Sequence, residues 1–392
     1  MAEARLNLVT GACGFVGTHL VRRLLAAGEA VIATDLAGAF EHPKTRFITE
    51  RLGLDFRHPR CTVQPCDLTD AAAVAQLFAR PVTHVFHTAS LYDYSAELPL
   101  LRRINVGGAV NLFEAALRCR PVPRFIHWST CGVFGKPYTA AMGRCCNVPF
   151  SEASPSPKNT PFGAAAPAGT HLVNDYSITK WEQEQLAWQC HRERGLPLTV
   201  IRPAPVYGPG SDYGHGGIVL ALNQGFGRFL PRDARNYITT SVHVEDVAGF
   251  AQFVADRPET VGEDYNVVDD SILSYAEFLH YIALLLGRRV CDVPLVYMPL
   301  VRRLMVGVAR LCRWLERQWG LPRMRMIEVG STTYMASSYW IANGKSKAAG
   351  YAYQYPDVKA GLRETVAWFR DAGWLAPDYH PRAAWKQVQR VP

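Results

Sequence analysis

Short runs of Val, Ile and Leu alternate with amphipathic stretches through the first half of the chain. Six of these runs predict buried strands, at residues 6–10, 30–35, 62–66, 84–88, 124–129 and 198–202. The stretches between them predict helices, for example at residues 14–27, 71–79 and 107–118. Strands that alternate with helices are typical of βαβ units. The pattern therefore predicts an α/β fold with a parallel sheet at its centre.

The alternation is interrupted after the fifth predicted strand and fades further along the chain. Residues 136–174 are rich in Pro, Gly, Ser and Ala, and they precede a strongly helical stretch at 175–194. A loop of that length inside a compact domain is usually functional or mobile. From about Tyr207 onward, short strands, helices and loops mix. We expect a smaller α+β part to follow the parallel sheet.

The composition is ordinary for a globular enzyme. Of the 392 residues, 48% are hydrophobic and 19% are charged, so a large core is expected. No apolar run reaches the ~18–20 residues that a membrane-spanning helix needs. The N-terminus shows no signal-peptide pattern, because a predicted strand already begins at Leu6. We therefore expect a cytoplasmic location, either free or on the membrane surface.

Ten cysteines are scattered along the chain with no C-x-x-C spacing. Reduced, structural thiols are the expectation, and no metal site is expected.

The net charge of +8 is concentrated in one segment. Residues 288–325 contain nine arginines against Asp292 and Glu316, so their local charge of nine minus two is +7. The rest of the chain therefore carries eight minus seven, or +1. Such a distribution does not indicate that the protein binds nucleic acid.

A glycine-rich turn follows the first predicted strand. Residues 10–17 read T-G-A-C-G-F-V-G and lead into a predicted helix. Glycines allow a tight turn and a close approach of the backbone to a pyrophosphate, and the helix N-terminus supplies N–H donors. A glycine triplet alone is weak evidence, but its place between a strand and a helix strengthens it. The candidate cofactor-binding residues in this turn are Gly11, Cys13, Gly14, Phe15, Val16 and Gly17.

The second predicted strand ends in Asp35, and no Arg or Lys follows closely. A carboxylate there can accept hydrogen bonds from the adenosine ribose and would repel a 2′-phosphate. NAD is therefore favoured over NADP, although Asp35 could merely cap a turn. Asp67 and Leu68 follow the third predicted strand and are suitably placed for the adenine edge.

A tyrosine and a lysine one turn apart begin the helical stretch after the insert. Tyr176 and Lys180 share one helix face, and a nearby ammonium lowers the pKa of a tyrosine. Such a tyrosine can take an alcohol proton while hydride leaves to a nicotinamide. Thr130 follows the fifth predicted strand at the ligand-binding edge and would hold the substrate oxygen. The Y-x-x-x-K spacing alone is common by chance, and Thr130 could be a strand-end hydroxyl without a catalytic role.

Together these motifs resemble the extended short-chain dehydrogenase/reductase family, within the NAD-dependent epimerase/dehydratase superfamily. The family's markers cover more than half of the chain, and Ser90 and Phe134 depart from a usual Ala and Tyr. The markers stand in order as T-G-A-C-G-F-V-G at 10–17, Asp35, Asp67-Leu68, H-T-A-S at 87–90, N-V-G-G at 105–108, S-T-C-G-V-F-G at 129–135, Y-x-x-x-K at 176–180, Arg202-Pro203 and V-Y-G-P-G at 206–210.

The resemblance implies a Rossmann-type doubly wound parallel sheet with a smaller C-terminal α+β substrate domain. Residues 1–205 and about 235–270 would bind NAD, and about 206–234 and 271–392 would bind the substrate. Tyr176 would be the general base, Lys180 would lower its pKa and bind the nicotinamide ribose, and Thr130 would orient the substrate. A homodimer is also implied. The further cofactor contacts implied are Asp67, Leu68, Thr88, Ala89, Ser90, Asn105, Tyr176, Lys180, Pro203 and Val206.

Two positions count against a nucleotide-sugar substrate. Members of the family that act on nucleotide sugars carry an Asn after the sixth strand. They also carry an Arg four residues before the His of an R-D-x-x-H-V-x-D-V motif. The matching positions here are Pro205 and Thr239. Both differences remove donors that a diphosphate would need.

Other segments are similar to the 3β-hydroxysteroid dehydrogenase branch. These are R-P-A-P-V-Y-G-P-G-S at 202–211, K-x-x-x-x-G-Y at 345–351 and G-L-x-x-T-V-x-W-F at 361–369. The resemblance implies an NAD-dependent dehydrogenase/reductase that acts on a secondary alcohol or ketone of a bulky apolar substrate, such as a 3β-hydroxysteroid or sterol. The alternatives are a long-chain 3-oxo lipid reductase, a nucleotide-sugar epimerase/dehydratase and, from another class, a non-catalytic NAD-sensing protein.

The arginine-rich segment predicts an amphipathic helix near residues 299–319. On a helical wheel its arginines at 302, 303, 310, 313 and 317 fall within about 100°. Apolar residues occupy the opposite side. Such a helix suits the surface of an anionic membrane, and its apolar side could equally cover the substrate pocket. The sequence leaves both interpretations open.

Overall fold

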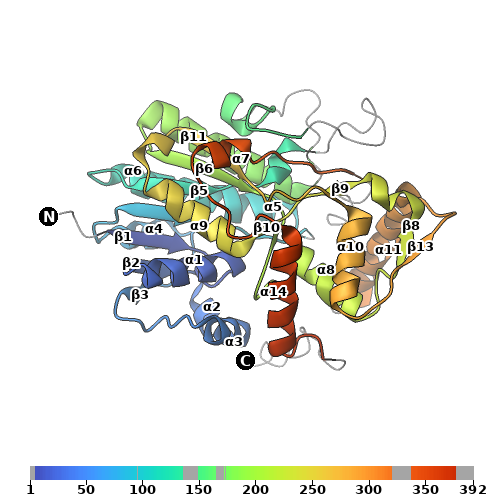
Figure 1. Cartoon of the computed structure of the whole chain (residues 1–392). Helices are drawn as coiled ribbons and strands as arrows, with labels where there is room; N and C mark the ends of the chain where they lie inside the picture. Colours follow the sequence, from blue (N-terminus) through green and yellow to red (C-terminus); the bar gives the residue numbers. More distant parts are fainter. Residues whose placement is uncertain are drawn as a thin grey trace.

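A seven-stranded parallel sheet forms the centre of the protein (Figure 1). The computed structural model describes residues 5–94, 96–135, 149–164, 172, 174–319 and 337–376. All six pairs of neighbouring strands are parallel, so the predicted Rossmann-type sheet is confirmed. Its spatial order is β11 (Glu263–Val267), β6 (Leu198–Pro203), β5 (Arg124–Trp128), β4 (His84–His87), β1 (Leu6–Thr10), β2 (Ala30–Thr34) and β3 (Cys61–Val63).

Helices cover both faces of this sheet. On one face, α1 (Phe15–Ala26) packs against α9 (Val244–Ala255). On the other face, α4 (Ala71–Leu77), α6 (Gly108–Arg118) and α7 (Asp175–Arg194) lie side by side. Each face has its own apolar core, since most strand side chains are buried on both sides of the sheet. The strand order reverses between β1 and β4, which is where open α/β sheets bind ligands.

The sheet differs from the predicted strands in two places. The third strand ends at Val63 rather than Cys66, although Gln64 N and Cys66 N still donate to the carbonyls of Ala33 and Asp35 at 3.0 and 2.9 Å. Strand β11 was not predicted, since its sequence E-D-Y-N-V places acidic and amide side chains in a buried strand. The partners that make this burial tolerable come from distant parts of the chain.

A second group of elements forms what we call the small lobe, at one end of the sheet (Figure 1). Short strands β8 and β13 pair in parallel within it, and helices α8 and α10 share its apolar core. The predicted basic amphipathic helix is observed as α11. The lobe consists of α8 (Gly214–Asn223), β8 (Phe229–Pro231), α10 (Tyr275–Leu285), β13 (Cys291–Val293) and α11 (Met298–Trp319).

Shorter elements join the sheet to the small lobe. Strand pairs β7–β10 and β9–β12 lie between them, and α14 (Val358–Asp371) packs on the core of the lobe. None of the described helices is both long enough and apolar enough to cross a membrane. The division of the chain at the predicted domain boundaries stays a prediction. The remaining bounds are α2 (Ala37–Glu41), α3 (Pro43–Leu52), α5 (Leu98–Leu101), β7 (Val206–Tyr207), β9 (Ile238–Thr239), β10 (Val242–His243), β12 (Leu273–Ser274) and α13 (Gly344–Ala348).

Part of the long insert is tied to the C-terminal region. Phe150 forms a parallel bridge with Ile341, and its ring stacks on Phe134 at 5.3 Å. Ile341 also lines the main cavity of the protein. Residues 149–164 therefore support the cavity wall from behind, while most of the rest of the predicted insert lies outside the described residues.

Candidate active site

A cavity of about 980 Å³ lies between the carboxyl ends of the sheet strands and the small lobe. The sheet contributes residues at or just after its strand ends, such as Thr10, Asp35 and Thr88, and the lobe contributes Met298 and Met305. The predicted catalytic and cofactor-binding residues all line this cavity, with two exceptions discussed below. Residues as far apart in the sequence as Gly11 and Val206 thus meet at one edge of the sheet.

The glycine-rich turn has no room for side chains. Gly11 has a φ of +69°, and a Cβ added to it would lie 2.9 Å from the Cα of Ala89. A Cβ on Gly17 would lie 2.0 Å from the carbonyl oxygen of Gly11. Helix α1 begins directly after this turn, and no side chain caps its first N–H groups. Those donors face the cavity edge and suit a pyrophosphate.

Asp35 is held in place by two backbone amides. Cys13 N donates to Oδ2 at 3.0 Å, and Leu36 N donates to Oδ1 at 2.8 Å. Burial nevertheless raises the pKa of this carboxyl above its usual range. Cys13 is not among the lining residues, so its part in the site is to orient Asp35 through the backbone. The carboxylate keeps lone pairs that could accept ribose hydroxyls.

Lys180 is fully enclosed at the base of the cavity. Its Nζ donates to the carbonyl of Trp128 at 2.6 Å, to Gln183 Oε1 at 2.8 Å and to Ser90 Oγ at 2.9 Å. Burial lowers the pKa of this ammonium from 10.5 to about 7, against the opposing charge of Glu184. Ser90, which departs from the family's usual Ala, therefore gives Lys180 an additional acceptor.

Tyr176 lies one helical turn before Lys180, among other tyrosines that sequence reasoning missed. Its ring is 4.8 Å from that of Tyr92 and 5.9 Å from that of Tyr94. Tyr213 is 5.0 Å from Tyr92, and all four rings line the cavity. The motifs L-Y-D-Y and G-S-D-Y, each just after a predicted cofactor-binding segment, were the available signal. The cluster forms an aromatic wall beside the catalytic tyrosine candidate.

Thr130 and Asn105 are positioned by the backbone around them. Thr130 follows β5, lines the cavity and accepts a hydrogen bond from Gly132 N at 3.1 Å. Asn105 is buried but does not line the cavity. Its Oδ1 accepts from Leu91 N at 2.7 Å, and its Nδ2 donates to Thr179 Oγ1 at 3.2 Å. Asn105 thereby joins the loop after β4 to the helix that carries Tyr176.

A buried ion-pair network lies behind the catalytic candidates. Arg202 on β6 is fully enclosed and donates to Glu184 on α7 and, at 2.6 Å, to Asp264 on β11. Glu184 also accepts from Ser129 Oγ, next to Thr130, and from Trp188 Nε1 at 3.0 Å. The network therefore joins α7 to β6, to β11 and to the residue that follows β5.

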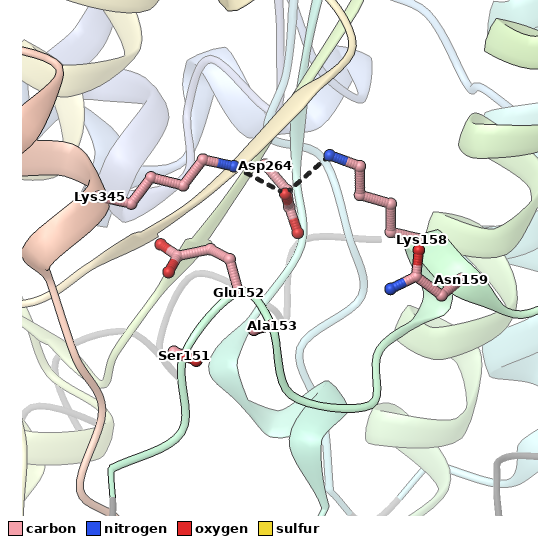
Figure 2. Close-up of a pocket in the computed structure, with 7 residues that line it drawn as sticks. All are labelled: Ser151, Glu152, Ala153, Lys158, Asn159, Asp264 and Lys345. Carbon is pink, nitrogen blue, oxygen red and sulfur yellow. Dashed lines mark hydrogen bonds and ion pairs between the residues drawn. The ribbon is translucent and has the colours of Figure 1, made fainter.

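The same network closes a second, shallower cavity of about 470 Å³ (Figure 2). In Figure 2, Lys158 and Lys345 approach Asp264 from opposite sides, at 3.1 and 3.2 Å. Burial alone would raise the pKa of Asp264, but Arg202 and the two lysines outweigh it and lower the pKa to about 2. Because these charges are paired with one another, we assign this cavity a structural role: it anchors the insert and the C-terminal segment to the sheet.

The part of the main cavity beside the small lobe is poor in positive charge. Among the described residues that line the cavity, Lys180 and Arg103 are the only Lys and Arg, and neither belongs to the lobe. Pro205 and Thr239 both line the wall at the positions where a diphosphate would need donors. His215 also lines it, and burial lowers the pKa of its ring to about 4, so it is neutral near pH 7.

Comparison with known proteins places these features in a family. The sequence profile described as the NAD dependent epimerase/dehydratase family matches residues 7–267. UDP-glucuronate 4-epimerase 3 of Arabidopsis thaliana is 32% identical over 206 residues, which are 52% of this chain and only 42% of that protein. UDP-glucose 4-epimerase of Mycolicibacterium smegmatis is 30% identical over 67% of this chain and 76% of its own.

A relative with a different described activity matches a similar share of the chain. The sterol-4-alpha-carboxylate 3-dehydrogenase (decarboxylating) of Bos taurus is 24% identical over 71% of this chain and 69% of its own. Among solved structures, the NAD complex of dTDP-glucose 4,6-dehydratase from Bacillus anthracis has a TM-score of 0.66 at 20% identity. It covers 94% of this chain and 98% of that one. This likeness confirms the fold.

Proposed function

This chain belongs to the NAD-dependent epimerase/dehydratase family, and from that membership we propose that it is an NAD-dependent dehydrogenase/reductase of bulky apolar alcohols. The reaction moves a hydride between NAD and a secondary alcohol or ketone. A 3β-hydroxysteroid or sterol is the substrate class that we favour.

The glycine-rich turn, the start of α1 and Asp35 fit the cofactor. The tight turn requires glycine at positions 11 and 17, where a Cβ would clash with the surrounding backbone, and the free N–H groups at the start of α1 can donate to a pyrophosphate. Asp35 is fixed at the end of β2, where it would accept the adenosine ribose hydroxyls and repel a 2′-phosphate. When bound, NAD supplies the hydride acceptor.

In the oxidative direction Tyr176 takes the hydroxyl proton of the substrate as hydride leaves. Burial lowers the pKa of Lys180 to about 7, and the ammonium form of this side chain favours the Tyr176 phenolate. Thr130 holds the substrate oxygen beside Tyr176. Trp128, Gln183 and Ser90 keep the lysine in place through its three hydrogen bonds.

The charge of the cavity carries the substrate proposal. A nucleotide sugar brings a diphosphate with two negative charges, which proteins usually meet with Arg, Lys or charged hydrogen bonds. The described residues of the lobe that line the cavity offer no Lys or Arg, and His215 is neutral. Met298, Met305 and Ile218 offer apolar contacts instead. The sterol dehydrogenase relative supports the same substrate class, though at only 24% identity.

A nucleotide-sugar epimerase is the second candidate, because relatives described as such are 30–32% identical to this chain. A long-chain 3-oxo lipid reductase would use the same apolar cavity and is distinguished by its direction. The homodimer expected from the resemblance also stays a prediction.

Parallel incubations of the purified full-length protein distinguish these candidates. With NAD and a 3β-hydroxysterol carried by cyclodextrin, we expect NADH to form, and with UDP-glucose we expect neither NADH nor UDP-galactose. Interconversion of the two sugars without net NADH would refute the proposal and establish the epimerase. NADH consumption with a 3-oxo lipid, and inertness of the sterol, would establish the reductase.

A further inference from the structure

The outward side of α11 exposes large apolar side chains to solvent. Leu300, Leu304, Leu311 and Trp314 are 59%, 66%, 55% and 54% exposed. Their spacing of four, seven and three residues places them along one side of the helix. A row of half-exposed leucines beside an exposed tryptophan is unfavourable in water and indicates a surface that meets a partner.

The exposed apolar surface continues onto the tip of the small lobe. Phe229 on β8 is 75% exposed, Phe226 just before it is 59% exposed, and Leu295 just after β13 is 87% exposed. Strands β8 and β13 are paired, and Arg232 N donates to the carbonyl of Val296 at 2.9 Å. These contacts hold the tip and the start of α11 together, on the side of the lobe away from the sheet (Figure 1). We call α11's outward side and this tip the outer face.

Positive charge surrounds the outer face. Five arginines next to the outer face are exposed. Asp292, on β13, is an exposed acidic residue nearby, and its Oδ1 lies 3.3 Å from His280 Nε2. The helical wheel placed all five arginines of the helix on one exposed side, but Arg302 and Arg313 are only partly exposed in the structure. A guanidinium nitrogen of Arg313 lies 4.0 Å from Glu97 Oε1. The exposed arginines are Arg228, Arg288, Arg289, Arg303 and Arg310.

The inward side of α11 belongs to the active-site cavity. Met298 is 2% exposed, and Met298 and Met305 both line the cavity. Ala309 is also buried on this side. A single helix therefore separates the cavity from the outer face.

We propose that the outer face docks on the surface of an anionic lipid bilayer, with α11 lying in the plane of the interface. Exposed leucine, phenylalanine and tryptophan side chains would enter the headgroup and acyl boundary, and the arginines would pair with anionic headgroups. A second copy of this chain is the less suitable partner. A two-fold interface would place the same arginines against each other, and like charges in contact are costly.

Docking would place the bilayer one helix away from the cavity, because the inward side of α11 lines it, and would shorten the path of a water-insoluble substrate from the bilayer. This consequence depends on the proposed function, but the docking itself does not. Binding to vesicles can therefore fail or succeed independently of catalysis.

Sedimentation with sucrose-loaded vesicles tests the proposal on the full-length protein. The vesicles are pure phosphatidylcholine, or a mixture in which roughly a third is phosphatidylserine. We expect binding to the mixed vesicles, weakened at least about tenfold by Leu304→Ser with Leu311→Ser, because less apolar area enters the interface. Arg303→Gln with Arg310→Gln should weaken it about tenfold on mixed vesicles only.

Matched controls come from the sheet domain, away from the small lobe. Val261→Ser removes an exposed apolar side chain, and Arg57→Gln removes an exposed arginine. Both should sediment like the wild type, and circular dichroism should show all variants folded.

Three results would overturn the docking proposal. The first is no sedimentation of the wild type with mixed vesicles, and the second is binding that neither double variant weakens. The third is a dimer that the leucine variant converts to a monomer, which would make the outer face a contact between copies. In a parallel assay, the leucine variant should lose activity on vesicle-embedded sterol but keep it on cyclodextrin-carried sterol. If the wild type were inactive on both vesicle-embedded and cyclodextrin-carried sterol, the result would count against the proposed function but not against the docking proposal.

Discussion

Replacing Arg202 by methionine tests the buried network that holds α7 against the sheet. The guanidinium is fully enclosed and bonds Glu184 on α7 and Asp264 on β11, both of which are also buried. Methionine keeps much of the apolar stem but removes the charge and every hydrogen bond. Two carboxylates are then left in the core without their shared partner.

The expected loss of unfolding free energy depends on the contacts that Glu184 and Asp264 retain. Removing one partner of a buried ion pair costs about 3–5 kcal/mol. Asp264 keeps Lys158 and Lys345, and Glu184 keeps its hydrogen bonds from Ser129 and Trp188. These remaining contacts place the expected loss near the lower end, at about 3 kcal/mol of unfolding free energy.

Urea unfolding followed by circular dichroism measures this loss. Arg194→Met is the matched control, because Arg194 also pairs with a glutamate but is 42% exposed, so its loss should stay below about 1 kcal/mol. If Arg202→Met were no more destabilising than Arg194→Met, the network would not hold the sheet and α7 together as we infer.

Three further predictions concern the site itself. Asp35→Ser should raise the ratio of kcat/KM for NADP over NAD about tenfold, because the carboxylate no longer repels a 2′-phosphate. Initial rates measured with both cofactors give this ratio. An unchanged ratio would mean that Asp35 only caps a turn. Thr130→Val should lower kcat roughly tenfold to a hundredfold, because the hydroxyl that holds the substrate oxygen is lost. Cofactor binding, measured by fluorescence titration, should stay unchanged. An unchanged kcat would show that Thr130 has no part in the mechanism. The pKa of Lys180 is lowered from 10.5 to about 7, so the unfolded chain binds more protons between these values. The wild type's unfolding free energy should therefore rise with pH across that window relative to Lys180→Met, and equal slopes for the two proteins would contradict the lowered pKa.

Much of the candidate site was predictable because its signals are local. Gly11 and Gly17 lie in a turn between a strand and a helix, Asp35 follows a strand, and Tyr176 and Lys180 share one helix face. A parallel sheet then brings the carboxyl ends of all its strands to one edge, so the motifs that follow these strands are expected to lie close together. Their placement around one cavity follows from the fold class alone.

Features that depend on distant partners could not be predicted in the same way. Strand β11 contains charged residues, and among the described residues Arg202, Lys158 and Lys345 supply the positive charges that pair with its buried Asp264. The tyrosine wall is assembled from three separate loops and helices. The amphipathic pattern of α11 was visible, but which side faces outward is decided by its packing against the lobe.

The measurement that tests the central claim most directly is deuteride transfer from a sterol labelled at C3. The protein is incubated with NAD and the labelled 3β-hydroxysterol, and the nicotinamide product is analysed by mass spectrometry. We predict deuterium in the reduced cofactor and 3-oxosterol as the product, with both lost in Tyr176→Phe. Unlabelled cofactor, or transfer that Tyr176→Phe leaves intact, would contradict the claim that Tyr176 drives hydride transfer from an apolar alcohol to NAD.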